Sequence, residues 1–311
     1  MSIIKHRKIW FTISSLAMTI SIVMIVLFGL KPGIDFTGGS LIEVEFKVDR
    51  PSGQEITDAL ADLDLGNLTI QLVGDQSMIL RLKEINEDIH QSILKTIRDK
   101  FQPDIDSGIE GVTLIAQVVE EKRFDSIGPT IGEELKTKTF WALGIVIIAI
   151  IFYIAWAFRK VSKPVASWKY GLIAVIALFH DVLITLGIFS VLGYLYGTEI
   201  DAVFVAALLT ILGYSVNDTI VVFDRTRENL VKHLGEDFES IVEESVGQVI
   251  TRSINSSLTT LLVLFSIMAL GGGSIRQFVL ALIIGITIGT YSSIFLASPL
   301  LVSLEKFKFK K

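Results

Sequence analysis

A single carboxylate, Asp218, lies inside an apolar stretch of the sequence, within GYSVNDTIVVFDRTREN (residues 213–229). A charged side chain is costly in hydrocarbon and, where one occurs, it usually belongs to an ion or substrate pathway. Arg252 begins a later apolar stretch at a similar depth and is the candidate partner. Burial favours a protonated carboxyl group and a nearby guanidinium favours an ionised one, so movement of Arg252 would switch proton binding. The pattern predicts a proton relay, and its structural alternative is a static Asp–Arg pair that holds two helices together.

Polar residues surround both candidates. They are Ser215, Asn217, Thr219, Ser253, Asn255, Ser256, Ser257, Thr259 and Thr260. Such a stripe is suited to hold water and conduct protons, and Asn217 is counted in the predicted relay. His180 and Asp181, in another apolar stretch, form a second candidate site, for which a hydrogen bond between packed helices is the alternative. Gly285 and Gly289 form a G-x-x-x-G pattern that favours close helix packing.

The elements that position these residues are membrane helices. The 311 residues are 51% hydrophobic, which is too apolar for an ordinary soluble domain. About 20 helical residues cross a bilayer, and six apolar stretches have this length. They are residues 9–30, 139–158, 170–195, 202–223, 253–270 and 278–304. The first stretch is too long for the apolar region of a secretory signal and is predicted to be retained.

Charge predicts the orientation of the chain. Residues 31–136 carry 11 Lys and Arg against 21 Asp and Glu, a net charge of −10, and the remainder carries 17 against 12, a net charge of +5. Basic residues flank the short loops and the ends: Lys5, Arg7, Lys8, Arg159, Lys160, Lys163, Lys169, Lys306, Lys308, Lys310 and Lys311. Because basic loops stay in the cytoplasm, both termini and the basic tail 305–311 are expected there. Residues 31–136 are expected outside, held together without disulfides because the chain has no cysteine.

The outer segment predicts an α+β domain. Ile42, Val44 and Phe46 alternate with charged residues, as in a half-buried strand, and Ser52 and Glu55 form a capping box ahead of a helix. Residues 67–82 predict a hairpin that turns at Gly74, residues 87–101 a helix, and residues 111–119 a last strand. The order βαββαβ indicates a ferredoxin-like domain, a fold that does not specify a function.

Two linkers join this domain to the membrane helices. The first, KPGIDFTGGS (31–40), contains Asp35, Gly38 and Gly39, and we expect the glycine pair to act as a hinge that tolerates alanine without loss of folding. The second, SIGPTIGEELK (126–136), contains Gly128 and Pro129, and Thr130 and Glu133 form a possible capping box. Between the fourth and fifth spans, the segment 224–251 has an apolar face, which predicts an amphipathic helix lying on the membrane surface. The spans and loops from 137 to 304 form the membrane half.

Other chemistry has little support in the sequence. There is no Walker A motif, the four histidines are scattered and cysteine is absent. We therefore expect no enzyme activity, no cofactor or metal and no nucleic-acid partner, and we expect the energy source to be an H⁺ or Na⁺ gradient.

The motifs together carry a family resemblance. The chain has one span, an outer domain and five more spans, and five motifs lie at fixed places in this order. They are GIDFTGGS, GPTIGEEL, HDVLITLGI, GYSVNDTIVVFDRTREN and TRSINSSLTT. In this arrangement the sequence resembles the SecF family of the resistance–nodulation–division superfamily. The resemblance covers essentially the whole chain. It implies that Asp218 and Arg252 match the proton-pathway residues of the family, and that the protein is a multi-pass protein of the bacterial inner membrane.

The resemblance also implies partners. SecF acts with SecD beside the SecYEG channel and YajC-type accessory subunits, in contact with membrane lipid, to move unfolded exported polypeptides. Superfamily members pair two six-span halves, so this chain is expected to need a SecD-like half. Two alternatives stay open, namely half of a small-molecule or lipid exporter on the same scaffold, and a scaffold subunit that transports nothing.

Overall fold

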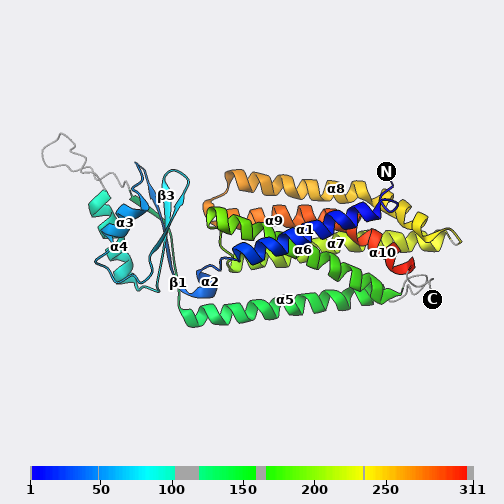
Figure 1. Ribbon diagram of the computed structural model, residues 1–311, viewed down its shortest axis with the longest axis horizontal. Coiled ribbons are helices and arrows are strands. Elements are labelled where there is room, and N and C mark those ends of the chain that lie inside the picture. Colours follow the sequence, from blue (N-terminus) through cyan, green and yellow to red (C-terminus); the bar gives the residue numbers. More distant parts are fainter. Residues whose placement is uncertain (1, 48, 102–118, 159–165, 234, 307–311) are drawn as a thin grey trace. The chain divides into compact units, whose positions relative to one another are not determined.

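The computed structural model describes residues 2–47, 49–101, 119–158, 166–233 and 235–306. The chain forms two compact units, one of residues 32–138 and the other of residues 1–31 with 139–311. The first unit is an α+β domain and the second is a helical bundle (Figure 1). The basic tail from residue 307 onward and the basic loop residues 159–165 lie outside the described residues.

The α+β unit has the predicted βαββαβ order. Its elements are β1 (Gly39–Phe46), α3 (Gly53–Ala59), β2 (Thr69–Val73), β3 (Ser77–Leu82), α4 (Glu87–Phe101) and β4 (Val119–Ile127). The strands form one sheet in the order β2-β3-β1-β4, with every neighbouring pair antiparallel. Figure 1 shows α3 and α4 on the same face of this sheet. The ferredoxin-like prediction is therefore confirmed.

The core of this unit follows from the alternation in β1. Ile42, Val44 and Phe46 are completely buried, whereas Glu43 and Glu45 between them are partly exposed. The three apolar side chains belong to one cluster with residues of both helices and of β3. Alternate side chains of a strand point to opposite faces, so one face packs under the helices and the other carries the charges.

The last strand lies further along the chain than predicted. Residues 111–118 of the predicted strand lie outside the described residues, and β4 runs from Val119 to Ile127. This strand is rich in charge and, of the described strands, it pairs with β1 alone, at the edge of the sheet. Lys122 Nζ lies 2.8 Å from Glu45, and Lys47 Nζ lies 3.1 Å from Glu120. Ion pairs across the strands stabilise an edge strand that lacks the apolar alternation we used as the signal.

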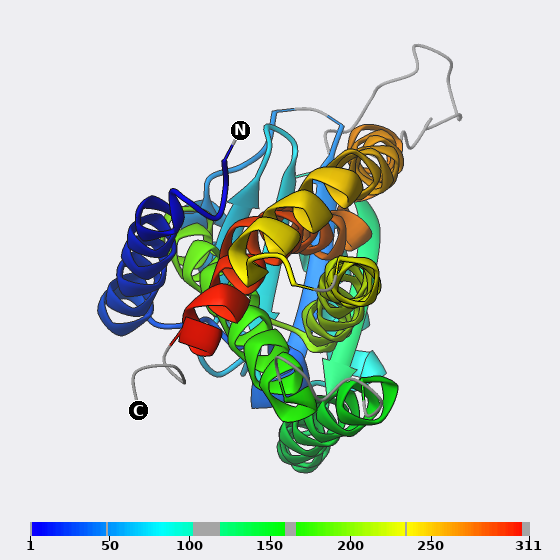
Figure 2. The same ribbon diagram turned by 90° about the vertical axis from the view of Figure 1, so that its right-hand side faces the viewer.

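The bundle contains six described helices that are long and apolar enough to cross a membrane, as predicted. They are α1 (Arg7–Phe28), α5 (Pro129–Ala157), α6 (Ser167–Tyr196), α7 (Ala202–Lys232), α8 (Phe238–Leu270) and a last one made of α9 (Gly273–Ser292), η1 (Ser293–Ala297) and α10 (Ser298–Lys306). Figure 2 views them nearly end-on. In α6 and in α7, 50% of the most apolar part of the helix is buried inside the structure, whereas in α5 only 6% of that part is buried. The outer helices therefore leave apolar surface uncovered, as lipid contact requires.

The segment 224–251 is not a separate surface helix. Its residues are the end of α7 and the first half of α8, which form a helical hairpin. Val242 and Val246 are buried in the same core cluster as Phe223, and Asn229 Nδ2 donates to Ser245 Oγ at 2.8 Å. The prediction was wrong because an apolar periodicity shows which face of a helix is covered, but not whether lipid or protein covers it.

The N-terminal segment is fastened to α8. The Glu243 carboxylate accepts hydrogen bonds from the backbone N–H groups of Ile3 and Ile4, both at 2.7 Å. Both isoleucine side chains are buried in the bundle core, and Arg7 forms an ion pair with Glu239 at 2.7 Å. These contacts connect residues about 240 positions apart and position the start of α1.

The two linker motifs meet at one junction inside the α+β unit. Gly38 and Gly39 have φ values of +72° and +118°. A Cβ atom on Gly38 would lie 2.8 Å from the Pro129 Cα atom, and one on Gly39 would lie 2.8 Å from the Leu82 carbonyl oxygen. Alanine therefore does not fit, and the expectation that folding tolerates it is wrong. A hinge motion at this pair stays a prediction.

The other linker residues lie close to the same junction. Asp35 belongs to the short helix α2 (Ile34–Thr37), which ends beside Gly38. A Cβ atom on Gly128 would lie 3.3 Å from Glu84 Oε1. Helix α5 begins at Pro129, so Thr130 lies within its first turn and not at the predicted N-cap.

We expect Ser52→Ala to loosen α3. Ser52 Oγ accepts from the Glu55 backbone N–H, and Glu55 accepts from the Ser52 N–H at 2.7 Å, which completes the predicted capping box. Loss of such a cap lowers the stability of a helix by about 1 kcal/mol. Amide hydrogens that exchange by local opening of the helix should then exchange about five-fold faster. Hydrogen exchange of residues 53–59 in the full-length protein measures this change, with Ser92→Ala on α4 as the control. Unchanged exchange would contradict the assignment.

The same hydrogen bonds make α3 sensitive to pH. They hold the pKa of Glu55 below its ordinary value of 4.5. A carboxyl whose pKa is lowered by folding stabilises the native state above its unfolded pKa, and this contribution is lost as the pH falls through the folded pKa. Protection of α3 should therefore decrease below about pH 4.5, and Ser52→Ala should reduce this dependence.

We expect Gly39→Ala to destabilise the α+β unit by more than about 2 kcal/mol, because the substitution combines a positive φ with overlap on the backbone of β3. Gly74→Ala is the matched control, since Gly74 has a φ of +55° with no atom within 4 Å of an added Cβ. That change should cost only about 1 kcal/mol. Pulse proteolysis of the membrane-inserted protein in urea compares the two variants, and equal loss would refute the packing argument.

Candidate functional site

Two carboxylates are buried where the helices of the bundle converge. Asp181 of α6 is completely buried and Asp218 of α7 is 8% exposed. Neighbouring segments supply hydroxyl groups to both: α7 and α8 contribute one serine each, and the junction of α9 with η1 contributes two. The structure therefore confirms that polar groups gather around Asp218, and it adds Asp181 to the same region.

Asp218 is held by two serines from other segments. Ser253 of α8 donates to Oδ1 at 2.6 Å, and Ser293 of η1 donates to Oδ2 at 2.5 Å. Both serines are buried. Each carboxylate oxygen therefore has a donor, which a buried carboxylate requires.

Asp181 has three side-chain partners. Ser215 of α7 donates to Oδ2 at 2.5 Å, Ser292 of α9 donates to the same oxygen at 2.8 Å, and Oδ1 lies 2.9 Å from His180 Nδ1. His180 is also completely buried, its ring stacks on Tyr291 with centroids 6.2 Å apart, and its Nε2 has no hydrogen-bond partner among the described residues. Asp181 therefore does join packed helices, which was the alternative to a relay role.

Arg252 does not lie where the sequence predicted it. Asp218 has no ion pair with Arg252 or with any other cation in the part of the chain that the structure describes. Ser253 faces Asp218, and consecutive residues on a helix point about 100° apart. Arg252 consequently lies on the exposed surface of α8. The similar depth of Arg252 and Asp218 in the membrane half was therefore insufficient to identify Arg252 as the partner of Asp218.

The surfaces of α7 and α8 carry further exposed polar residues. On α7 these are Thr210 and Asn217, and on α8 they are Arg252, Asn255, Ser256 and Thr259. In a helix that crosses a membrane, such groups normally face protein or water. We call them the uncovered polar face.

The sequence analysis missed Ser292 and Ser293. Only the G-x-x-x-G pattern was noted in the sixth span, although two adjacent hydroxyls three and four residues after Gly289 were an available signal. The glycines themselves were interpreted correctly. A Cβ atom on Gly285 would lie 2.2 Å from Ile211 Cδ1, and one on Gly289 would lie 3.0 Å from Ser215 Cβ. Close contact of α9 with α7 places Ser292 and Ser293 beside the carboxylates.

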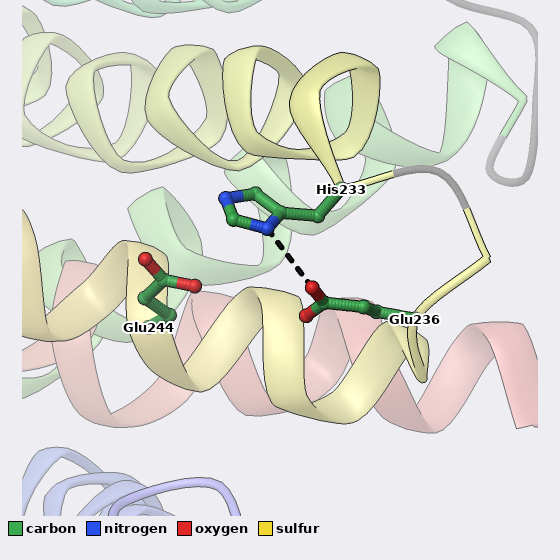
Figure 3. A group of neighbouring side chains, drawn as sticks. All are labelled: His233, Glu236 and Glu244. Carbon is green, nitrogen blue, oxygen red and sulfur yellow. Dashed lines mark hydrogen bonds and ion pairs between the residues drawn. The ribbon is translucent and has the colours of Figure 1, made fainter.

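A separate group of possible metal ligands lies at the turn between α7 and α8 (Figure 3). The ligand atoms of His233, Glu236 and Glu244 all lie within 4.8 Å of one another, and His233 Nδ1 is 3.0 Å from Glu236 Oε1. Both glutamates are exposed. Exposed groups of this kind form ordinary ion pairs, and no other feature of the described turn indicates a metal, so we assign none to it.

Comparison with known proteins identifies the family. A family model described as protein export membrane protein SecD/SecF, C-terminal, matches residues 110–307, and a model of the SecD/SecF GG motif matches residues 23–49. The first match includes both carboxylates and the second includes the Gly38–Gly39 pair.

Whole proteins show the same relationship. The chain is 40% identical to protein translocase subunit SecF of Thermobaculum terrenum, over 99% of this chain and 95% of that protein. It is 36% identical to protein translocase subunit SecF of Anaerolinea thermophila, over 100% and 96%. The crystal structure of SecDF, a translocon-associated membrane protein from Thermus thermophilus, superposes with a TM-score of 0.79 at 28% identity, covering 98% of this chain and 39% of that longer one. The chain therefore belongs to the SecD/SecF family of protein export membrane proteins.

Proposed function

We propose that this chain is a SecF-type subunit of a protein translocase, in which proton binding at Asp218 couples an ion gradient to protein export. The observation that carries the proposal is a buried carboxylate held only by serine hydroxyls, with no cation beside it among the described residues. Such a site binds and releases a proton without breaking an ion pair. A static Asp–Arg pair, which was the alternative, is not present.

The energy available from the gradient is modest. One elementary charge that crosses 100 mV releases about 2.3 kcal/mol. This amount biases a two-state equilibrium by a factor of about 50, so export of one polypeptide would use several protons. Carboxylate and hydroxyl oxygens also suit Na⁺, and the identity of the coupling ion is therefore part of the test.

A SecD-type half is the proposed partner. The uncovered polar face of α7 and α8 supports a partner there, because Arg252 and its neighbours would otherwise face lipid. The similar SecDF chain is more than twice as long as this one, which agrees with a second half. With that half in place, Arg252 would face a protein interface close to Asp218. SecYEG, YajC-type accessory subunits and unfolded exported polypeptides complete the assembly that we propose.

We expect Asp218→Asn to abolish gradient-dependent export while assembly with the partner half is retained. Asparagine keeps the size of the side chain but cannot take up a proton. Export into inverted membrane vesicles, with and without an H⁺ or Na⁺ gradient, measures the effect. Asp224→Asn is the matched control, because Asp224 lies on the same helix with an exposed side chain. An assembled Asp218→Asn protein that responds fully to the gradient would exclude the mechanism.

We also propose that both termini and the α7–α8 turn are cytoplasmic and that residues 31–136 are outside, as the charge distribution predicts. Single cysteines at Gln76 and Ser240 test this orientation, because both positions are exposed and the chain has no other cysteine. An impermeant thiol reagent should label Gln76→Cys from outside the cell and Ser240→Cys only in inverted vesicles. Labelling of both from one side would disprove the orientation.

A further inference from the structure

Two consecutive serines lie where α9 changes to a π-helix. Ser292 is the last residue of α9 and Ser293 is the first residue of η1, and both are completely buried. Ser298 Oγ donates to the Ser293 carbonyl oxygen at 3.0 Å, across five residues. Single π-helical turns of this kind occur frequently at functional sites.

The two serines serve different carboxylates. Ser292 donates to Asp181 Oδ2 at 2.8 Å, and Ser293 donates to Asp218 Oδ2 at 2.5 Å. Asp181 belongs to α6 and Asp218 to α7, so one peptide unit of the sixth span links carboxylates from two other spans. Ser215, which also donates to Asp181, lies one turn before Asp218 on α7. Each carboxylate has its own hydrogen-bond partners, and the adjacent residues Ser292 and Ser293 join the two groups through the backbone.

Each of these hydroxyls has a second acceptor within reach. Ser292 Oγ lies 3.1 Å from the Gly289 carbonyl oxygen, and Ser293 Oγ lies 3.0 Å from the Thr290 carbonyl oxygen. A hydroxyl has one proton to donate and lone pairs to accept with. It can donate to an ionised carboxylate, or accept from a protonated carboxyl group while donating to the backbone carbonyl. Both protonation states are then satisfied in one side-chain position.

We propose that Ser292 and Ser293 are positioning residues of a single proton site that contains Asp181 as well as Asp218. When a carboxylate takes up a proton, its O–H donates to the serine oxygen and the serine O–H turns to the backbone carbonyl. The serine neither gains nor loses a proton in this step. The inference rests on the proposed function, because it assumes that Asp218 is the proton-binding group.

The other titratable groups around the cluster are few. On α6 there is His180, beside Asp181 Oδ1. On α9 there is Tyr291, which stacks on His180, and on α7 there is Tyr214, which donates to Ser257 of α8. The charged residue on the adjoining part of α8, Arg252, is exposed. Among the described residues, serine hydroxyls are therefore the side-chain partners of Asp218, whereas Asp181 has His180 beside its two serines.

Infrared difference spectroscopy of the purified complex with its partner half tests the proposal. Titration with acid should produce two carboxyl C=O bands, one absent in Asp218→Asn and the other absent in Asp181→Asn. Ser293→Ala should move the Asp218 band to higher wavenumber, because the protonated carboxyl group loses a hydrogen-bond acceptor, and Ser292→Ala should do the same to the Asp181 band. Ser303→Ala is the control, since within the described residues this hydroxyl donates to the backbone carbonyl of Pro299 alone.

Conservative variants separate this role from a purely structural one. Ser293→Thr keeps the hydroxyl and should restore both the band position and gradient-dependent export. Ser293→Cys is close in size but is a weak donor, and it should shift the band even if Ser293→Ala does not fold.

Unchanged bands in folded Ser292 and Ser293 variants would overturn this inference, as would the absence of an Asp181 band. Either outcome would leave the proposed function in place. The proposed function fails by a different result, an assembled Asp218→Asn protein that still responds to the gradient.

Discussion

The requirement that buried carboxylates have hydrogen-bond donors constrains the whole helical bundle. An ionised carboxylate in apolar surroundings without a partner would cost several kcal/mol, so Asp181 and Asp218 need donors from neighbouring segments. Four serines from α7, α8 and the α9–η1 junction meet this need. Gly285 and Gly289 permit the close approach of α9 to α7. Packing at the centre of the bundle is therefore organised around polar groups as much as around apolar ones.

The same constraint bears on the partner half that we propose. Its inner carboxylates are satisfied within the chain, but the polar residues on the outer faces of α7 and α8 are not covered by the described residues. Hydrocarbon is a poor environment for Arg252 and Asn255. Membership of the SecD/SecF family and the greater length of the similar SecDF chain both agree with a second half.

The sequence was informative wherever a local pattern determines a local structure. The alternation of Ile42, Val44 and Phe46 identified β1, the Ser52–Glu55 pair identified the start of α3, and Asp218 within an apolar stretch indicated a buried polar region of the bundle. Errors arose where the outcome depends on a neighbouring element. The partner of Asp218 depends on which side of α8 faces α7, and a shift of one residue replaced Arg252 by Ser253.

Two further features were beyond prediction for related reasons. Strand β4 is stabilised by ion pairs with β1, and its own sequence has no apolar alternation. Ser292 and Ser293 are common residues, and only the tertiary structure shows that they contact two carboxylates. Helical periodicity gives the angular position of a side chain on its own helix, and tertiary packing decides what that side chain meets.

The attachment of the N-terminal segment to Glu243 sets an order for biogenesis. The backbone N–H of Ile4 and its acceptor are 239 positions apart in the chain. Ribosomes add about 5–20 residues per second, so roughly 12–48 s separate the synthesis of the two groups. During that interval, α1 occupies the bilayer before its anchor exists. The contacts of Ile3 and Ile4 with Glu243 are therefore a late step in maturation, later than the synthesis of α6, on which α1 also packs.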